Sequence, residues 1–151
     1  MKIWFRDYRL EDLVKVADRY LAKLIGIELL ELGDDFIRAK MPVDERTWMP
    51  MGLLHGGASC VLAESLGSYA SYLSIDLQKQ SIVGLEINAN HLRSAREGWV
   101  FGTVRPLQVG RSIHVWDIRI EDADQSLICV SRLTVKVNDR PADSPLVQST
   151  Q

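Results

Sequence analysis

The sequence is poor in residues that bind metals or form disulfides. Its two cysteines, Cys60 and Cys129, form no CxxC pair and no spacing typical of a metal site. Its three histidines, His55, His91 and His114, lie far apart along the chain. We therefore expect two free thiols in a reducing cytoplasm, with no metal site and no cofactor.

Long apolar runs and strongly basic segments are missing as well. No apolar run approaches the roughly 20 residues that cross a bilayer, and residues 1–13 lack the apolar core of a signal peptide. The formal net charge is −2, and no run of Lys or Arg marks a nucleic-acid-binding surface. These absences predict a cytoplasmic protein that binds neither membranes nor nucleic acids.

The length of 151 residues and the 46% hydrophobic content fit one globular domain with an ordinary core. No internal repeat or linker divides the chain. Residues 138–151 contain two prolines and mostly polar side chains. We expect a single domain over residues 1–137, followed by a disordered C-terminal tail.

Hydrophobic periodicity predicts two helices and six strands. An amphipathic helix covers residues 10–25, and Gly26 follows it as a C-terminal cap. The remaining predicted elements are a hairpin at 27–32 and 36–41, a central helix that ends at Leu73, and strands at 81–91, 99–107, 112–121 and 126–137. This order predicts an α+β fold in which a curved antiparallel sheet wraps the long central helix.

The central helix has almost no charge. Glu64 is its one charged residue, and small residues recur on one face, at Ser59, Ala63, Gly67 and Ala70. A surface helix usually carries several charges, whereas a small-residue face lets another backbone approach closely. We therefore expect this helix to be covered on all sides and Glu64 to be at least partly buried, which requires a functional or structural reason.

The glycine-rich turn before this helix predicts a site for a polarised oxygen. The first N–H groups of a helix have no intrahelical partner and lie at the positive end of the helix dipole. Gly56 and Gly57 leave room for a ligand to approach them. A carbonyl oxygen bound there would occupy an oxyanion hole.

Four segments carry a more specific pattern, in the order MGLLHGGAS (51–59), AESLGS (63–68), GLEINANH (84–91) and PLQVGR (106–111). Together they resemble the hotdog-fold acyl-CoA thioesterases. The likeness covers residues 1–137. It is nearest to the branch with the phenylacetate-pathway, Arthrobacter-type 4-hydroxybenzoyl-CoA and 1,4-dihydroxy-2-naphthoyl-CoA thioesterases.

The resemblance implies roles for residues of the central helix and the turn before it. Glu64 matches the catalytic carboxylate, which acts as nucleophile or as general base on water. Gly56 matches the N–H that polarises the thioester carbonyl, with His55 beside it. Ser68 matches a hydroxyl that helps to hold the attacking water or the substrate.

The resemblance also implies how coenzyme A (CoA), here part of the substrate, is held. His91 and Arg93 match a segment near the pantetheine and phosphate groups, and Gly110 and Arg111 match a loop at the nucleotide end. Arg96 is a further candidate for the phosphates. The family builds each active site at a subunit interface, usually in a tetramer, so we expect a homotetramer.

Met49 departs from the family pattern. Close relatives have a glutamine before the loop proline, where its amide contacts the thioester or the catalytic centre. A methionine cannot donate a hydrogen bond there. Either the oxyanion hole relies on Gly56 and His55, or the acyl pocket is more apolar in this chain.

The sequence predicts an acyl-CoA thioesterase that hydrolyses an aromatic or medium-chain acyl-CoA. A hydratase or dehydratase with the same fold is an alternative, in which His55 and Glu64 would transfer protons at carbon. A non-catalytic acyl-CoA-binding module is the other alternative, favoured by Met49. Release of free CoA thiol distinguishes hydrolysis from both.

Overall fold

The computed structural model describes residues 1–140. Its helices are α1 (Leu10–Ala17), α2 (Tyr20–Leu24) and α3 (Gly56–Leu73). Its strands are β1 (Glu28–Leu32), β2 (Ile37–Pro42), β3 (Gln80–His91), β4 (Trp99–Val109), β5 (Ile113–Glu121) and β6 (Leu127–Asp139). The elements follow the predicted order, and most predicted boundaries lie within two residues of those observed.

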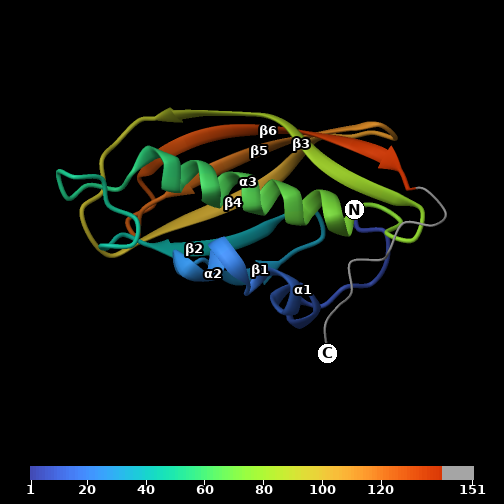
Figure 1. The fold of residues 1–151 in the computed structure, drawn as a ribbon, viewed down its shortest axis with the longest axis horizontal. Coiled ribbons are helices and arrows are strands. Elements are labelled where there is room, and N and C mark those ends of the chain that lie inside the picture. The colour runs from blue at the N-terminus through green and yellow to red at the C-terminus, as the bar shows by residue number, and fades with distance from the viewer. Residues whose placement is uncertain (141–151) are drawn as a thin grey trace.

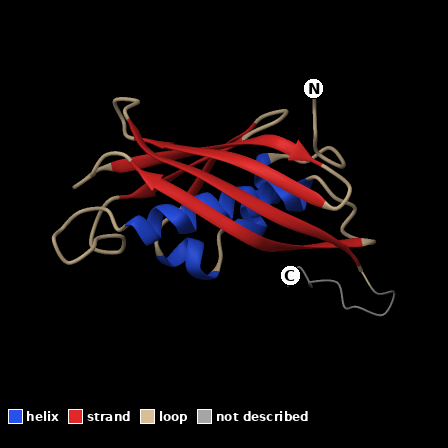
Figure 2. Ribbon diagram, turned by 90° about the horizontal axis from the view of Figure 1, so that it is seen from above, coloured by secondary structure: helices blue, strands red, loops and turns tan. Residues whose placement is uncertain are grey.

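The six strands form one antiparallel sheet with the order β1-β2-β4-β5-β6-β3. The sheet makes one layer and the helices make the other, with α3 running along the concave side of the strands (Figures 1 and 2). This arrangement confirms the predicted α+β hotdog fold. Strands β4, β5 and β6 form the predicted meander, whereas β3 crosses over to pair with β6 at the edge of the sheet.

The small-residue face of α3 lies against the sheet, as predicted. A Cβ atom built on Gly67 would stand 2.5 Å from Cδ2 of Leu133 on β6. In return, a Cβ atom on Gly102 of β4 would stand 2.8 Å from Cδ1 of Leu66. Leu66 and Leu133 are both fully buried. Helix and sheet therefore interlock at glycines, which explains how the backbone of α3 comes so close to β4 and β6.

The prediction of one helix over residues 10–25 was wrong, because the chain breaks between α1 and α2. Arg19 adopts an extended backbone, and Tyr20 has φ = 51°, so the helical hydrogen-bond ladder cannot continue through them. Gly26, with φ = 77°, ends α2 in a Schellman motif in which the N–H of Ile27 donates to the carbonyl of Ala22. Gly26 therefore has the predicted capping role.

The end of the sheet corrects the predicted start of the C-terminal tail. Asn138 and Asp139 belong to β6, where they pair with Ser81 and Gln80 of β3. The rest of the expected tail, residues 141–151, lies outside the described residues. Within residues 1–140, none of the helices has both the length and the apolar character of a membrane span.

Candidate active site

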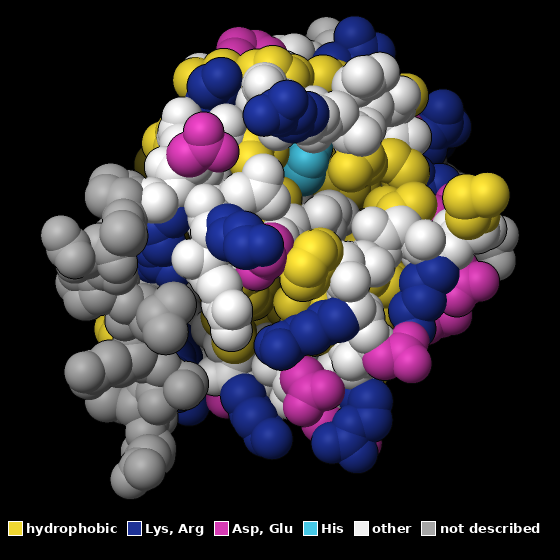
Figure 3. All heavy atoms as spheres, turned by 90° about the vertical axis from the view of Figure 1, so that its right-hand side faces the viewer, with side chains coloured by type: hydrophobic (Ala, Val, Ile, Leu, Met, Phe, Trp, Pro, Cys, Tyr) yellow, Lys and Arg dark blue, Asp and Glu magenta, His cyan; other side chains and the backbone are white. Residues whose placement is uncertain are grey.

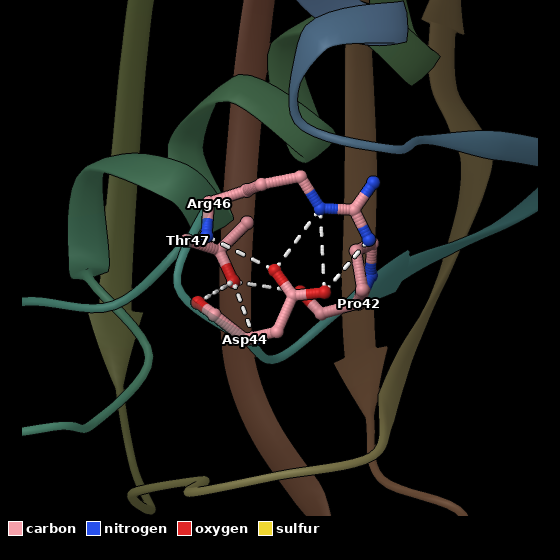
Figure 4. A network of polar contacts seen from close by, with 4 residues as sticks. All are labelled: Pro42, Asp44, Arg46 and Thr47. Carbon is pink, nitrogen blue, oxygen red and sulfur yellow. Dashed lines mark hydrogen bonds and ion pairs between the residues drawn. The ribbon is translucent and has the colours of Figure 1, made fainter.

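The loop between β2 and α3, residues 43–55, is fixed at its base by Thr47. This side chain is 2% exposed, and its hydroxyl donates to the carbonyl of Pro42 at 2.7 Å and accepts from the N–H of Asp44 at 3.3 Å (Figure 4). Asp44 also pairs with Arg46, Oδ2 to Nη2 at 2.7 Å. The loop therefore leaves β2 in a defined direction.

The far half of the loop is held by the segment that follows β3. The indole N–H of Trp48 donates to the carbonyl of Arg96 at 2.9 Å, and the N–H of Leu54 donates to the carbonyl of Ala95 at 2.8 Å. The N–H of His55 donates to the carbonyl of Thr47 at 2.8 Å. These bonds place the end of the loop, and with it the start of α3, beside residues 91–96.

His55 caps the N-terminus of α3 with its own ring. Its Nδ1 atom accepts a hydrogen bond from the N–H of Gly57 at 2.8 Å, so the neutral ring carries its proton on Nε2. The N–H of Ala58 donates to the carbonyl of His55. Among the described residues, the N–H of Gly56 has no acceptor. Gly56 is therefore the free donor of the first turn, at the positive end of the helix dipole.

A cavity of about 400 Å³ lies at this helix start. It is lined by Met49, Leu53, Leu54, His55, Gly56, Ser59, His91, Leu92, Arg93, Ser94 and Ile128. The structure thus brings together five of the predicted site residues: Met49, His55, Gly56, His91 and Arg93. The lining combines an apolar wall with a few polar groups, as in small-molecule binding sites.

His91, which was predicted to lie near the pantetheine and phosphate groups of CoA, lies beside the start of α3. A Cβ atom built on Gly56 would stand 2.8 Å from Nε2 of His91, so the imidazole covers the backbone of Gly56. His91 is the last residue of β3, where it pairs with Cys129 of β6. The end of β3 therefore positions the ring beside the backbone of Gly56.

Glu64 is exposed in the single chain, so the prediction of partial burial was wrong for one copy. Its Oε1 atom lies 3.0 Å from the Cβ position of Gly84 on β3, at the open edge of the sheet. The half-buried Ser68 lies one turn further along the same helix face. The structure places Glu64 on the side of α3 that faces this edge.

Cys60 shares the helix face of Glu64. Burial, with a further contribution from the Glu64 charge, raises the pKa of the Cys60 thiol. Burial likewise raises the pKa of Cys129, to about 11. Both cysteines are free thiols in the structure. Since the thiolate is the reactive form, neither cysteine has the properties of a nucleophile.

Gly56 and Glu64 do not form one reaction centre within a single chain. They lie eight positions apart on one helix, which separates their backbones by roughly 12 Å along its axis. The Glu64 carboxylate lies at Gly84 of β3, whereas Gly56 lies at His91. These two β3 residues are seven positions apart, roughly 23 Å along the strand, so the carboxylate does not reach a carbonyl group held by Gly56. Within one chain, the predicted oxyanion donor and the predicted base are therefore too far apart to act on the same thioester.

Gly110 and Arg111 lie near the opposite end of β6. Arg111 lines a polar basin with Ser112, Lys136 and Asp139. The pairing of Cys129 with His91 and of Lys136 with Val83 puts the two ends roughly 23 Å apart along β6. Viewed from this end, the surface shows Lys and Arg side chains interspersed with Asp and Glu (Figure 3).

Several cavity residues were not identified from the sequence as site residues. Ser59 lines the cavity although it is 1% exposed. In the sequence, Ser59 was interpreted only as one of the small residues that face the sheet. Leu92 and Ile128 carry no sequence signal, since they meet only through the pairing of the chain after β3 with β6. In the described part of the chain, no three His, Cys, Asp or Glu side chains are grouped as metal ligands.

Several bacterial proteins resemble this chain over most of its length. The 1,4-dihydroxy-2-naphthoyl-CoA hydrolase of Escherichia coli K12 is 50% identical over 135 residues, which cover 89% of this chain and 98% of the relative. The proofreading thioesterase EntH of Cronobacter turicensis is 47% identical over 135 residues, with the same two coverages.

Solved structures agree with these relatives. A thioesterase of Pseudomonas aeruginosa, crystallised with a glutamine replaced by alanine, matches with a TM-score of 0.89 and 47% identity over 92% of this chain and all of that one. A Staphylococcus aureus protein, crystallised with a glutamate replaced by alanine, gives a TM-score of 0.77 and 38% identity over 80% of this chain and all of that one. A second structure of the S. aureus protein, there called a thioesterase, has a glutamine replaced by alanine.

The family model that matches residues 51–129 is described as the thioesterase superfamily. This span includes the start of α3, Glu64 and the end of β3. Together with the relatives and the fold, it shows that the chain belongs to the thioesterase superfamily and is a thioester hydrolase with the hotdog fold.

Proposed function

We propose that this chain hydrolyses an aromatic or medium-chain acyl-CoA to the free acid and CoA. The observation that carries the proposal is the free N–H of Gly56 at the wall of a cavity lined by Leu53, Leu54 and Met49. An acyl group fits such an apolar lining, and its thioester oxygen fits the free donor. The name of the E. coli relative, a naphthoyl-CoA hydrolase, favours an aromatic acyl group.

In the proposed reaction, Gly56 polarises the carbonyl and Glu64 supplies the base. The Glu64 carboxylate takes a proton from water while the water oxygen bonds to the carbonyl carbon, and the C=O electron pair moves to the oxygen. Collapse of this intermediate breaks the C–S bond, and the departing thiolate receives the proton. The alternative is direct attack by the Glu64 carboxylate on the carbonyl carbon, which breaks the C–S bond, releases the CoA thiolate and leaves a mixed anhydride. Water then hydrolyses the anhydride to the free acid and the regenerated carboxylate.

The separation of Gly56 and Glu64 favours a site completed by a second copy of the chain. Within one chain the two are roughly 12 Å apart along the helix. A twofold axis presents Glu64 of one copy to Gly56 of the other and forms two equal sites. Burial of Glu64, expected from the sequence, would then arise on assembly.

The edge strand β3 is the surface through which we propose this pairing. Its outer edge has no strand partner among residues 1–140. Val83 and Leu85 on this strand are 50% and 57% exposed. Exposed apolar side chains on an edge strand without a partner favour association with another chain. A pair of such dimers would give the tetramer that the family resemblance implies.

The spacing of two altered residues in the S. aureus relative supports the assignment of Glu64. In that protein the replaced glutamine precedes the replaced glutamate by the same number of positions as Met49 precedes Glu64 here. We therefore propose Glu64 as the catalytic carboxylate, with Ser68 one turn away to hold the attacking water. His91 and Arg93 would meet the pantetheine end of CoA, and Arg111 its nucleotide end.

The test is release of CoA thiol from 1,4-dihydroxy-2-naphthoyl-CoA, phenylacetyl-CoA and a medium-chain acyl-CoA. We expect wild type to turn over at least one of them. Glu64→Gln, which keeps the shape and loses the base, should lower kcat roughly 10²–10⁴-fold with an unchanged circular dichroism spectrum. Glu64→Asp serves as the control that keeps the carboxylate.

Two outcomes would contradict the proposal. If wild type binds these esters without releasing thiol, the assignment of acyl-CoA hydrolysis fails. The hydratase and the non-catalytic binding module are then the remaining alternatives. If wild type is active but Glu64→Gln retains full kcat, hydrolysis stands and the assignment of Glu64 fails.

A further inference from the structure

The candidate oxyanion hole contains few hydrogen-bond donors. The N–H of Gly57 is occupied by Nδ1 of His55, which leaves Gly56 as the free backbone donor of the first turn. Met49, which also lines the cavity, has no side-chain donor, and its sulfur accepts from the N–H of Met51 at 3.4 Å. Oxyanion holes are commonly built from more than one donor, and the polar side chains that line this cavity include His55, Ser59 and His91.

His91 is positioned to provide the second donor. Its Nε2 atom lies 2.8 Å from the Cβ position of Gly56, so the nitrogens of the two groups are no more than roughly 5.3 Å apart. An oxygen at hydrogen-bond distance from one nitrogen can therefore be at hydrogen-bond distance from the other. Nothing in residues 1–140 holds this Nε2 atom in another hydrogen bond.

We propose that the Nε2–H of His91 donates to the thioester carbonyl oxygen together with the N–H of Gly56, and supplies the donor that Met49 lacks. This role rests on the proposed thioester hydrolysis at this cavity. It makes His91 a catalytic residue whose hydrogen bond strengthens as negative charge develops on the oxygen. A residue that only contacts CoA would bind the ground state and the transition state equally.

The first experiment separates these roles by steady-state kinetics on the best acyl-CoA substrate. His91→Phe keeps a ring and removes the donor, so kcat should fall roughly 100-fold while KM changes less than threefold. His91→Gln places an amide N–H near the position of Nε2 and should recover at least tenfold of that loss. A raised KM with an unchanged kcat in His91→Phe would overturn the proposal.

The second experiment is a double-mutant cycle with Met49. Glutamine has nearly the length of methionine and carries an amide donor, whereas Met49→Leu is the matched control without one. The loss caused by His91→Phe should shrink about tenfold in the Met49→Gln background and stay unchanged in the Met49→Leu background. An equal loss in all three backgrounds would contradict a shared carbonyl oxygen.

Failure of this proposal is distinguishable from failure of the proposed function. If wild type releases no thiol from any acyl-CoA, the function itself fails. If wild type is active and His91→Phe has wild-type kcat, only the role of His91 fails. His91 is exposed, so its variants should keep the wild-type thermal unfolding midpoint, which a calorimetric scan checks.

Discussion

At the scale of single residues, His114 is the buried titratable group with the clearest consequence. Ser71 accepts a hydrogen bond from the indole N–H of Trp116 at 2.7 Å, so its own hydroxyl proton is free to donate to Nδ1 of His114 at 3.1 Å. All three side chains are buried between α3 and β5. Burial lowers the pKa of His114, against a smaller opposite effect of its hydrogen bond with the Gly110 backbone.

The lowered pKa makes stability depend on pH in one direction. Below about pH 6.5, the unfolded chain binds a proton on His114 that the folded protein binds less readily, so the free energy of unfolding falls. The slope from this one group reaches at most about 1.4 kcal/mol per pH unit. Urea unfolding between pH 7.5 and 5.5 should show a smaller decline in His114→Gln than in wild type. Equal declines would contradict this account.

At the scale of elements, the contact of α3 with β6 determines how closely helix and sheet approach. Replacing a glycine with alanine inside a helix usually stabilises the helix by about 1 kcal/mol. At Gly67 the new methyl group would meet Leu133 at 2.5 Å in a fully buried contact. The clash should outweigh the helix propensity.

We therefore expect Gly67→Ala to destabilise the protein by about 1–3 kcal/mol, which lowers Tm by roughly 2–4 °C for each kcal/mol. Leu133→Val shortens the opposing side chain, so the double variant should lose less than the sum of the two single losses. Calorimetry of the four proteins measures both effects. A Gly67→Ala protein with a higher Tm than wild type would show that the sheet moves away freely.

The helices and strands also show which features hydrophobic periodicity could predict and which it could not. Apolar patterns and turn residues predicted every strand, although residues 27–32 form a short apolar run and not an alternating one. It did not predict the break at Arg19 and Tyr20, since the apolar spacing continues through both residues. Nor could it pair β3 with β6, because that contact joins residues 38 to 59 positions apart.

At the scale of the whole molecule, the proposed shared site predicts complementation between two inactive variants. Glu64→Gln lacks the base, and Gly56→Val places side-chain atoms where His91 Nε2 lies. In a mixed dimer, one of the two sites combines an intact Gly56 with an intact Glu64. Refolding the two variants together at equal concentration should restore about one quarter of wild-type activity.

The control for this experiment is each variant refolded alone, which should stay inactive. A mixture without activity, formed under conditions where wild type refolds to an active dimer, would mean that each chain builds its own site. Light scattering gives the assembly state of each sample. Leu85→Lys on the exposed edge of β3 should shift the protein toward monomer and lower activity with it.

The sequence by itself determined the strand pattern, the central helix and the family, because these depend on local periodicity and on residues that are contiguous or close in the chain. It also singled out Gly56 and Glu64. Only the tertiary structure decided that Glu64 is exposed in one copy, that His91 covers Gly56, and that Arg111 lies near the far end of β6. Each of these depends on strand pairing and on the packing of α3, which bring together residues far apart in the chain.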